Sequence, residues 1–276
     1  MTACRLGEVE ADVVQRIARA PSVFCFLDYD GTLAPVVATP DAASPLSGTA
    51  AVLQALAGRP GTQVALVTGR SVADLRRLLD VPGIYYVGIH GLEVCFPNGT
   101  VELSESVAAM RSVLPAIKRE MEQTLASCPG ILIEDKGLAL ACHYRLASPG
   151  DGASARETVA AIAEIHQRRG APVMVTHGHE VVEVRSALAN KGKTVCQLLA
   201  ACAPTALAVY IGDDQTDEDA FLSLPPESIT IRVGPASVPT AARYRIADPD
   251  EVLRFLRLVV AHRHNRAPAT AQTVDG

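Results

Sequence analysis

The sequence predicts an α/β protein in which helices cover both faces of a parallel sheet. Five runs of apolar and β-branched residues recur along the chain, at 23–28, 63–68, 84–89, 206–212 and 228–233. Runs that are apolar on both faces and separated by helical patterns are typical of buried parallel strands. Between two of these runs, Val72, Leu75 and Leu79 recur at helical spacing, as expected of a helix packed on a sheet. We therefore expect a doubly wound, Rossmann-like core.

The middle third of the chain has a different pattern, which predicts an α+β insert. Its expected elements are a helix (107–127), two extended runs (131–135 and 138–145), a second helix (153–169) and two more extended runs (172–176 and 180–185). The members of each extended pair are joined by a short turn that contains Gly137 or Gly178, which predicts antiparallel hairpins. We therefore assign 105–188 to an inserted domain, and 1–104 with 189–276 to the core.

Composition and charge argue against several kinds of partner. The 276 residues are 49% apolar and 20% charged, as in a compact globular protein. No apolar run approaches the ~18–20 residues that span a bilayer, so we expect no membrane segment. The net charge is −5 and aromatic residues make up only 4%, which argues against a surface that neutralises phosphates and stacks bases. Nucleic acid is therefore not an expected partner.

The cysteines and the N-terminal residues predict a cytoplasmic protein. The seven cysteines are odd in number, include no C-x-x-C pair and mostly lie in apolar runs, which favours buried thiols in a reducing compartment over disulfides or zinc. The first twenty residues mix charged and apolar side chains and contain no continuous hydrophobic segment of the kind found in signal peptides. The last ten residues, 267–276, are expected to form a frayed tail.

Polar side chains gather at the predicted ends of three strands. Asp28 and Asp30 follow the first strand, Thr68, Gly69 and Arg70 follow the second, and Asp213, Asp214 and Asp217 follow the fourth. In open α/β sheets ligands bind beyond the carboxyl ends of the strands, so these groups are expected in one crevice. Crowded carboxylates repel, and protonation or a hard cation such as Mg²⁺ relieves the repulsion. A lone Asp-Gly or Asp-Asp is usually a turn or a helix cap, but turn chemistry does not explain two acidic clusters, a threonine and a lysine together.

This combination resembles the haloacid dehalogenase superfamily over nearly the whole chain. The four motifs correspond to DYDGT (28–32), the threonine of VTGR (67–70), the lysine of NKGK (190–193) and GDDQTDED (212–219). The resemblance implies that Asp28 is a nucleophile that forms an aspartyl-phosphate, and that Asp30 is the general acid and base. Thr68 and Lys191 would neutralise the phosphoryl charge. The implied cofactor is Mg²⁺, and the implied metal-binding residues are Asp28, Asp30, Asp213 and Asp214.

Three assignments around these motifs leave alternatives. Lys193 competes with Lys191 for the third motif, although residues 190–192 match the N-K-G form of the superfamily and Lys193 would begin a helix. Asp217 either binds the metal directly or orients Lys191. Arg70 either contacts the substrate or only caps the sheet or pairs with a surface acid.

Four stretches are similar to the trehalose-6-phosphate phosphatase family in particular. They are GIHGLE (88–93), KGLALACHYR (136–145), GHEVVEVR (178–185) and GDDQTDEDAF (212–221). The resemblance implies that the insert is a C2-type cap, that the substrate is trehalose 6-phosphate, and that the protein has a functional link to a trehalose-phosphate synthase. The residues expected to bind the sugar phosphate are Gly69, Arg70, His90, Gly91, Glu93, Lys136, His143, Arg145, His179, Glu183, Arg185 and Asn190.

The chain departs from the pattern of this family at two positions of the cap. His179 stands where lysine is common, and Ser186 stands where proline is common. These departures keep open a phosphatase for another sugar phosphate, such as sucrose phosphate or mannosylglycerate phosphate. A non-catalytic phospho-acceptor or a sugar-binding module is a further alternative. His166 and His262, near the ends of predicted helices, are expected on the surface.

Overall fold

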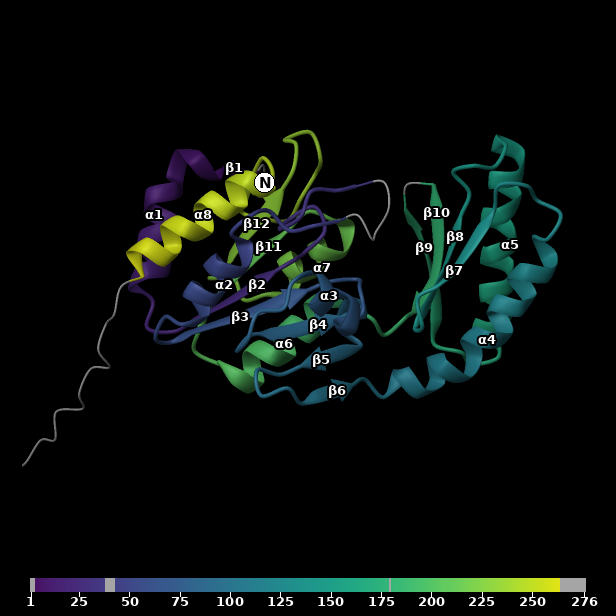
Figure 1. The fold of residues 1–276 in the computed structure, drawn as a ribbon, viewed down its shortest axis with the longest axis horizontal. Helices are drawn as coiled ribbons and strands as arrows, with labels where there is room; N and C mark the ends of the chain where they lie inside the picture. The colour runs from purple at the N-terminus through teal and green to yellow at the C-terminus, as the bar shows by residue number, and fades with distance from the viewer. Residues whose placement is uncertain (1–2, 38–42, 179, 264–276) are drawn as a thin grey trace, which may run out of the picture. The chain divides into compact units, whose positions relative to one another are not determined.

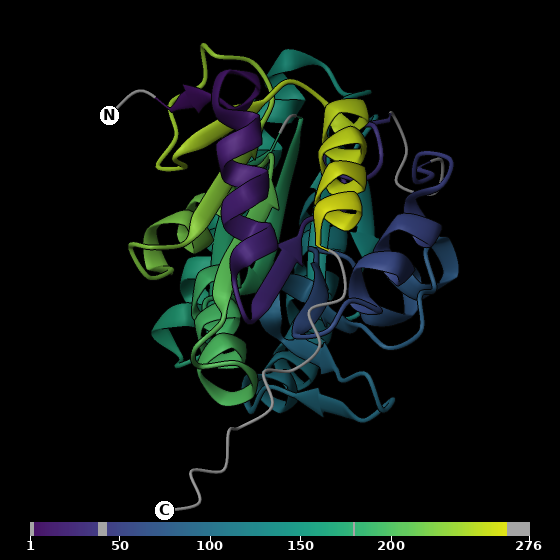
Figure 2. The same cartoon turned by 90° about the vertical axis from the view of Figure 1, so that its left-hand side faces the viewer.

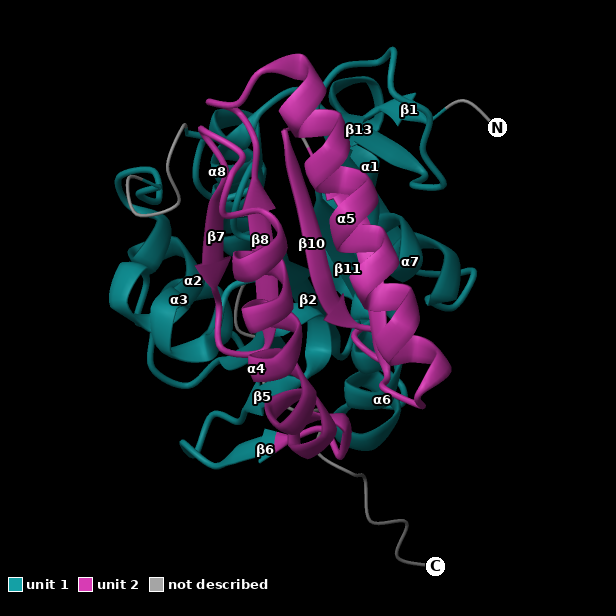
Figure 3. Cartoon of the chain, turned by 90° about the vertical axis from the view of Figure 1, so that its right-hand side faces the viewer, with its two compact units in different colours: residues 1–102, 190–276 teal, residues 103–189 magenta. Residues whose placement is uncertain are grey.

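The protein forms two compact units. The computed structural model describes residues 3–37, 43–178 and 180–263. One unit comprises residues 1–102 and 190–276, and the other comprises residues 103–189 (Figure 3). The predicted tail, 267–276, lies outside the described residues. Within the described part of the chain, no helix is both long enough and apolar enough to cross a membrane.

The first unit is built on a nine-stranded sheet with the strand order β1-β13-β12-β11-β2-β3-β4-β5-β6. Its strands are β1 (Cys4–Arg5), β2 (Val23–Leu27), β3 (Thr62–Val67), β4 (Tyr85–Gly88), β5 (Glu93–Cys95), β6 (Val101–Leu103), β11 (Leu207–Gly212), β12 (Ile229–Val233) and β13 (Tyr244–Ile246). Neighbours from β1 to β4 are parallel, and β5 runs antiparallel to β4. The five predicted strands are confirmed, and four short strands at the edges extend the sheet.

Helices cover both faces of this sheet, as the doubly wound prediction requires (Figure 1). They are α1 (Leu6–Arg19), α2 (Thr49–Ala57), α3 (Val72–Leu78), α6 (Lys191–Cys202), α7 (Gln215–Ser223) and α8 (Pro249–His262). Alternate residues of β2 point to opposite faces, so Val23 and Cys25 pack in one core with α1, α2 and α8, while Phe24 and Phe26 pack in the other with α6 and α7. Figure 2 shows α1 and α8 side by side over the first of these cores.

The order of the central strands places a binding edge at the end of β2. From β2 the chain continues to β3 on one side, and it returns later as β11 on the other side. At such a reversal of strand order the loops after the strands part and leave a crevice. The loops after β2, β3 and β11 are those that carry the polar residues singled out from the sequence.

The second unit is a four-stranded antiparallel sheet with two helices. The sheet has the order β7-β8-β10-β9, and its elements are α4 (Ser106–Thr124), β7 (Leu132–Asp135), β8 (Ala139–His143), α5 (Pro149–Arg168), β9 (Val173–Gly178) and β10 (Val181–Ser186). Both predicted hairpins are confirmed, because β7 pairs with β8 and β9 with β10, each antiparallel. The helices α4 and α5 lie against one face of the sheet (Figure 1), where Leu140, Val182 and Val184 are fully buried. The predicted α+β insert is therefore observed.

Three predictions about local structure need correction. The helix α5 begins at Pro149, four residues before the predicted start, because Ser148 caps it by accepting from the backbone N–H of Asp151. His166 is buried and its Nε2 lies 3.2 Å from Glu120 of α4, so the surface prediction was wrong for it. That prediction is confirmed for His262, which is exposed. All seven cysteines are free thiols, but only Cys25, Cys95 and Cys142 are fully buried.

Candidate active site

Asp28 and Lys191 form the buried centre of the first unit. Asp28 follows β2 directly and Lys191 is the first residue of α6, and their side chains are only 5% and 2% exposed. Lys191 Nζ donates to Asp28 Oδ1 at 2.7 Å and to Asp217 Oδ1 at 2.8 Å. Burial alone would lower the pKa of Lys191, but the two carboxylates more than offset burial and raise this pKa above its usual value. Lys191 is therefore a charged ammonium group that donates a hydrogen bond to Asp28.

The two lysines of the third motif have different surroundings. Lys193 is exposed, and its backbone N–H donates to Asn190 Oδ1 at 2.8 Å. Asn190 is thus the N-cap of α6, and its amide nitrogen donates to Asp219 Oδ2 at 3.1 Å. The cap directs the first turn of α6 so that Lys191, and not Lys193, reaches Asp28. Both polar ends of Asn190, predicted to bind substrate, are engaged with protein groups.

Asp217 is fully buried and accepts three hydrogen bonds. Its Oδ1 accepts from Lys191 and from the Tyr210 hydroxyl at 2.7 Å, and its Oδ2 accepts from the backbone N–H of Asp214 at 2.9 Å. The last bond belongs to a capping box at the start of α7, in which Asp214 is the N-cap. Of the two roles left open for Asp217, orientation of Lys191 is the one seen in these contacts.

Three carboxylates crowd around the lysine. Oxygen atoms of Asp28, Asp213 and Asp217 lie within 4.8 Å of one another. Burial raises the pKa of Asp28 well above its ordinary value, and although Lys191 opposes this shift, the charges of Asp217 and Asp213 add to it. Burial and the charge of Asp217 also raise the pKa of Asp213 to about 6. One ammonium does not neutralise three carboxylates, so the cluster fits a hard divalent cation, which prefers oxygen ligands.

Two of the predicted metal-binding residues lie outside this cluster. Asp30 forms a bidentate ion pair with Arg70, in which Arg70 Nε and Nη2 lie 2.7 Å from the two carboxylate oxygens. The Asp30 side chain is 42% exposed. Asp214 is exposed, and it is the N-cap residue of α7. Asp217, which was not among the predicted metal-binding residues, lies in the cluster instead. Arg70 pairs with Asp30, the predicted general acid and base.

The loop after β3 packs against the short 3₁₀ turn at Ile89–Gly91. Thr68 is buried, its Oγ1 accepts from the backbone N–H of Arg70 at 3.1 Å, and its carbonyl accepts from the backbone N–H of His90 at 2.9 Å. The His90 ring lies directly against Gly69. Gly91 has φ +105, and a Cβ there would lie 2.1 Å from Thr194 Oγ1, so only glycine fits where this turn meets α6. Thr68, Gly69, His90 and Gly91 are thus brought together.

Glu93 has a structural contact that the sequence did not suggest. Its Oε2 accepts from the backbone N–H of Val72 at 2.9 Å, at the first residue of α3. A carboxylate at this place satisfies a helix N–H that has no partner within the helix. Glu93 therefore holds α3 to β5 in this structure.

In the second unit, several of the predicted sugar-binding residues contact acidic or basic side chains, on the face of the sheet opposite the helices or at its end. Glu183 alternates along β10 with Val182 and Val184, which point to the helices, so its side chain lies on the other face. Lys136 Nζ contacts Glu183 Oε1. Two further pairs join His143 Nε2 to Glu134 at 2.9 Å and Arg145 Nε to Glu180 at 2.7 Å.

Arg185 differs from the other charged residues of this sheet. Only 8% of it is exposed, and its Nη1 donates to the backbone carbonyl of Ala189 at 3.0 Å. This bond ties the end of β10 to the segment that follows it. His179, also predicted to bind the substrate, lies outside the described residues.

Sequence reasoning missed three polar residues that complete these groups. Glu134 and Glu180 are the acidic partners of His143 and Arg145, and Tyr210 is a partner of Asp217. Glu134 could have been predicted, because it lies two positions from Lys136 and a strand places alternate residues on one face. Tyr210 had no such signal, since it lies within an apolar run.

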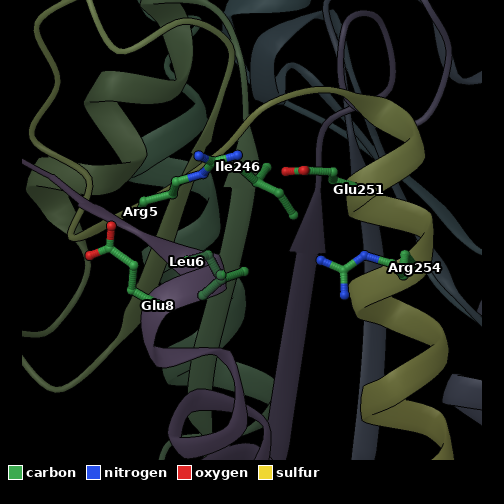
Figure 4. Close-up of a pocket in the computed structure, with 7 residues that line it drawn as sticks. Arg5, Leu6, Glu8, Ile246, Glu251 and Arg254 are labelled. Carbon is green, nitrogen blue, oxygen red and sulfur yellow. The ribbon is translucent and has the colours of Figure 1, made fainter.

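A separate hollow in the first unit contains none of these residues. It lies between the start of α1 and the helix α8 (Figure 4), and it is lined by Arg5, Leu6, Gly7, Glu8, Ile246, Glu251 and Arg254. In the strand order, β1 at this hollow is four strands from β2. The hollow is therefore not part of the site around Asp28.

Comparison with known proteins agrees with this geometry. Residues 26–250, which include all the residues around Asp28, match the family model described as trehalose-phosphatase. The chain belongs to the trehalose-phosphatase family. A trehalose-phosphate phosphatase of Mycobacterium marinum is 36% identical over 259 residues, which cover 88% of this chain and 64% of that protein. The chain thus spans slightly less than two thirds of the length of this relative.

Solved structures show the same fold. The C-terminal domain of the Candida albicans trehalose-6-phosphate phosphatase has a TM-score of 0.80 and 25% identity, and the match covers 95% of this chain and 98% of that one. A haloacid dehalogenase-like hydrolase from Bacteroides thetaiotaomicron has a TM-score of 0.61 and 15% identity, covering 86% and 99%. The second likeness concerns the fold alone. The predicted fold, that of a haloacid dehalogenase-like core with an inserted α+β unit, is therefore confirmed for this member of the trehalose-phosphatase family.

Proposed function

We propose that the protein is a Mg²⁺-dependent phosphatase that hydrolyses trehalose 6-phosphate to trehalose and inorganic phosphate. The observation that carries the proposal is the buried pair of Lys191 and Asp28 at the end of β2, in a chain of the trehalose-phosphatase family. A carboxylate in this position can attack phosphorus and divide the hydrolysis into two steps. The similar proteins named above, a trehalose-phosphate phosphatase and a trehalose-6-phosphate phosphatase domain, support this substrate.

In the first step, an oxygen of Asp28 bonds to phosphorus and the bond from phosphorus to the sugar oxygen breaks. Asp30 donates a proton to the departing sugar oxygen, because an alkoxide is a poor leaving group. In the second step, Asp30 takes a proton from a water molecule. The water oxygen bonds to phosphorus, the bond from phosphorus to Asp28 breaks, and inorganic phosphate is released. Lys191 and Thr68 stabilise negative charge on the transferring group. Asp30 must leave its ion pair with Arg70, or move together with it, to carry out both roles.

The cluster around Lys191 provides the proposed metal site. Asp28 and Asp213 are its proposed ligands, because Asp217 already accepts three hydrogen bonds and Asp214 caps α7. The cation would neutralise charge on the phosphoryl group and on the carboxylates. Asp28 and Asp213 thereby gain a partner for the charge that burial makes unfavourable.

The second unit is proposed to be the cap that selects the sugar. A disaccharide presents many hydroxyl groups and no charge beyond its phosphate, so recognition requires polar groups on rigid strands. The face of the β7-β8-β10-β9 sheet opposite the helices carries such groups in His143 and Glu183, and Lys136 contacts Glu183. Each is partly exposed and contacts the side chain of a neighbour, which fixes its orientation.

We further propose a cytoplasmic location and a functional link to a trehalose-phosphate synthase. The seven free thiols suit a reducing compartment. A phosphatase of this specificity needs a reaction that supplies its phosphate ester. A sugar transfer onto glucose 6-phosphate, the reaction of such a synthase, has the required product.

Phosphate release from a panel of substrates tests the proposed function. We expect the fastest turnover on trehalose 6-phosphate, slower turnover on sucrose phosphate and mannosylglycerate phosphate, and loss of all activity by several orders of magnitude in Asp28→Asn. A preference for another sugar phosphate would change the substrate and leave the mechanism intact. Absence of turnover on every ester, in a folded protein supplied with Mg²⁺, would instead identify a non-catalytic module.

A further inference from the structure

We propose that Tyr210 is a positioning residue for the phosphoryl-transfer site, and that its hydroxyl aims Lys191 at the nucleophile by fixing Asp217. The Tyr210 hydroxyl donates to Asp217 Oδ1 at 2.7 Å, and the same oxygen accepts from Lys191 Nζ at 2.8 Å. Lys191 in turn donates to Asp28 at 2.7 Å. The inference rests on the proposed function, because it assigns a role within that reaction.

The contacts of Asp217 explain why an additional donor matters. A carboxylate on one side-chain torsion can rotate, and its terminal torsion has a broad energy profile. In Asp217, Oδ2 is held by the backbone N–H of Asp214, while Oδ1 is held by Lys191 and Tyr210. Two of these three donors belong to fixed structures, the N-terminus of α7 and the strand β11. Lys191 reaches the carboxylate on a long side chain with four torsions, so it takes its position from a carboxylate that the other two donors hold in place.

The strand β11 brings Tyr210 and Asp217 together through its last residues. Tyr210 and Gly212 lie two positions apart and therefore point to the same face of the sheet. A Cβ at Gly212 would lie 2.3 Å from Cγ of Asp217, so the glycine leaves the space that Asp217 occupies. The carboxylate thus reaches over Gly212 to the hydroxyl of Tyr210.

The ring of Tyr210 is held independently of its hydroxyl. It stacks with Phe26 at 6.4 Å between ring centroids and meets Phe221 edge to face at 5.6 Å. The residue is fully buried, within the core formed with α6 and α7. Removal of the hydroxyl alone therefore leaves the packing of the ring in place, and a phenylalanine fits the same space.

The Tyr210 hydroxyl acts as the donor in its bond to Asp217. Burial raises the pKa of the phenol well above its ordinary value, and the charges of Asp217 and Asp28 raise it further. A buried phenol hydroxyl needs an acceptor for its proton, and Asp217 is that acceptor. The geometry and the burial of the phenol therefore agree on Tyr210 as the donor and Asp217 as the acceptor.

Tyr210→Phe tests this inference, with Tyr86→Phe as the matched control. Tyr86 is also buried, and its hydroxyl contacts the backbone of Leu79 and Val81, outside the site around Asp28. We expect Tyr210→Phe to lower kcat on trehalose 6-phosphate about 10- to 100-fold and to change KM less than about threefold, because the hydroxyl does not touch the substrate. Tyr86→Phe should change kcat less than about twofold at a similar shift in Tm.

A double-mutant cycle with Asp217→Asn shows whether the hydroxyl acts through Asp217. In the Asp217→Asn background the charge that ties Lys191 to this position is gone, so adding Tyr210→Phe should lower kcat less than about threefold. Independent effects that multiply would overturn the inference, as would a Tyr210→Phe enzyme that keeps more than half of the wild-type kcat. Should Tyr210→Phe fail to fold, near wild-type kcat in folded Asp217→Asn would overturn it equally. A wild-type enzyme that releases no phosphate would contradict the proposed function itself.

Discussion

Lys191 Nζ lies 2.7 Å from Asp28 Oδ1, although 163 residues separate the two in the sequence. The whole second unit lies within that separation. The contact forms because α6 begins at the edge of the sheet where β2 ends, and because the Asn190 cap fixes its first turn. Both side chains are buried, so the ammonium and the carboxylate each depend on the other for a partner.

Lys191→Met should abolish turnover, while Lys193→Met should not. Without the ammonium, Asp28 and Asp217 lose the countercharge that lowers the pKa of Asp28, so this pKa rises further and less of the nucleophile is ionised. We expect kcat to fall about 1,000-fold or more in the first variant and less than about twofold in the second. Phosphate-release assays on both variants, with circular dichroism to verify folding, make the comparison. Equal losses in the two variants would contradict the assignment of the third motif to Lys191.

Removal of the metal should stop the reaction, and the carboxylates should differ in how strongly they hold it. EDTA is expected to abolish turnover and added Mg²⁺ to restore it, with Ca²⁺ a poor replacement because its larger, looser coordination misplaces oxygen ligands. Asp213→Asn should weaken Mg²⁺ binding about tenfold or more, and Asp214→Asn much less, because Asp213 lies in the buried cluster and Asp214 caps α7. Calorimetric titration of the apoprotein with Mg²⁺ measures both. A larger effect of Asp214→Asn would move the metal site out of the cluster.

Asp30→Asn should reveal the role of a proton on the leaving group. An aryl phosphate with a nitrophenol leaving group departs without protonation, whereas a sugar alkoxide does not. The variant should therefore release about one equivalent of nitrophenol in a rapid burst and then turn over slowly, because the aspartyl-phosphate lacks its base. No burst is expected with trehalose 6-phosphate, on which the first step itself is slow. Rapid steady turnover of the sugar phosphate by Asp30→Asn would exclude Asp30 as the acid.

The parts of the fold that could be predicted from the sequence are those with long, periodic patterns. The five central strands are apolar on both faces, and a glycine lies in the turn of one hairpin of the second unit (Gly137) and at the end of a strand in the other (Gly178), so both features were visible. The strands β1 and β13 contain two and three residues, and so short a run has no period to detect. Their pairing depends on neighbours that are distant in sequence.

The candidate site was predictable where a residue follows a strand, and less so where local bonds decide its role. Asp28 and Lys191 are where their motifs indicated. Asp30, Glu93 and Asn190 also lie in the motifs, but in the structure a guanidinium, a helix N–H and a helix cap engage them. Residue type does not reveal the partners of Asp30 and Glu93, because each of these bonds depends on the distance between two elements. The bonds from Lys191 and Tyr210 to Asp217 are of the same kind, whereas the cap by Asn190 is local.

Glu183 and Arg185 lie two positions apart on β10, yet they should respond to mutation in different ways. Glu183 is partly exposed and pairs with Lys136, whereas Arg185 is 8% exposed and donates to the backbone of Ala189. Glu183→Ala should therefore lower kcat/KM for trehalose 6-phosphate by tens to hundreds of fold, at about 1–3 kcal/mol per lost bond, and leave an aryl phosphate nearly unaffected.

Arg185→Ala should instead destabilise the second unit. Loss of its guanidinium leaves the carbonyl of Ala189 without this donor and opens space at the end of β10, so we expect a lower Tm and a similar loss of activity on both substrates. Thermal unfolding and parallel assays on trehalose 6-phosphate and nitrophenyl phosphate separate the two variants. Equal losses on both substrates in Glu183→Ala would mean that Glu183 supports the fold and does not recognise the sugar. A selective loss on trehalose 6-phosphate in Arg185→Ala, at unchanged Tm, would assign sugar recognition to Arg185 despite its burial.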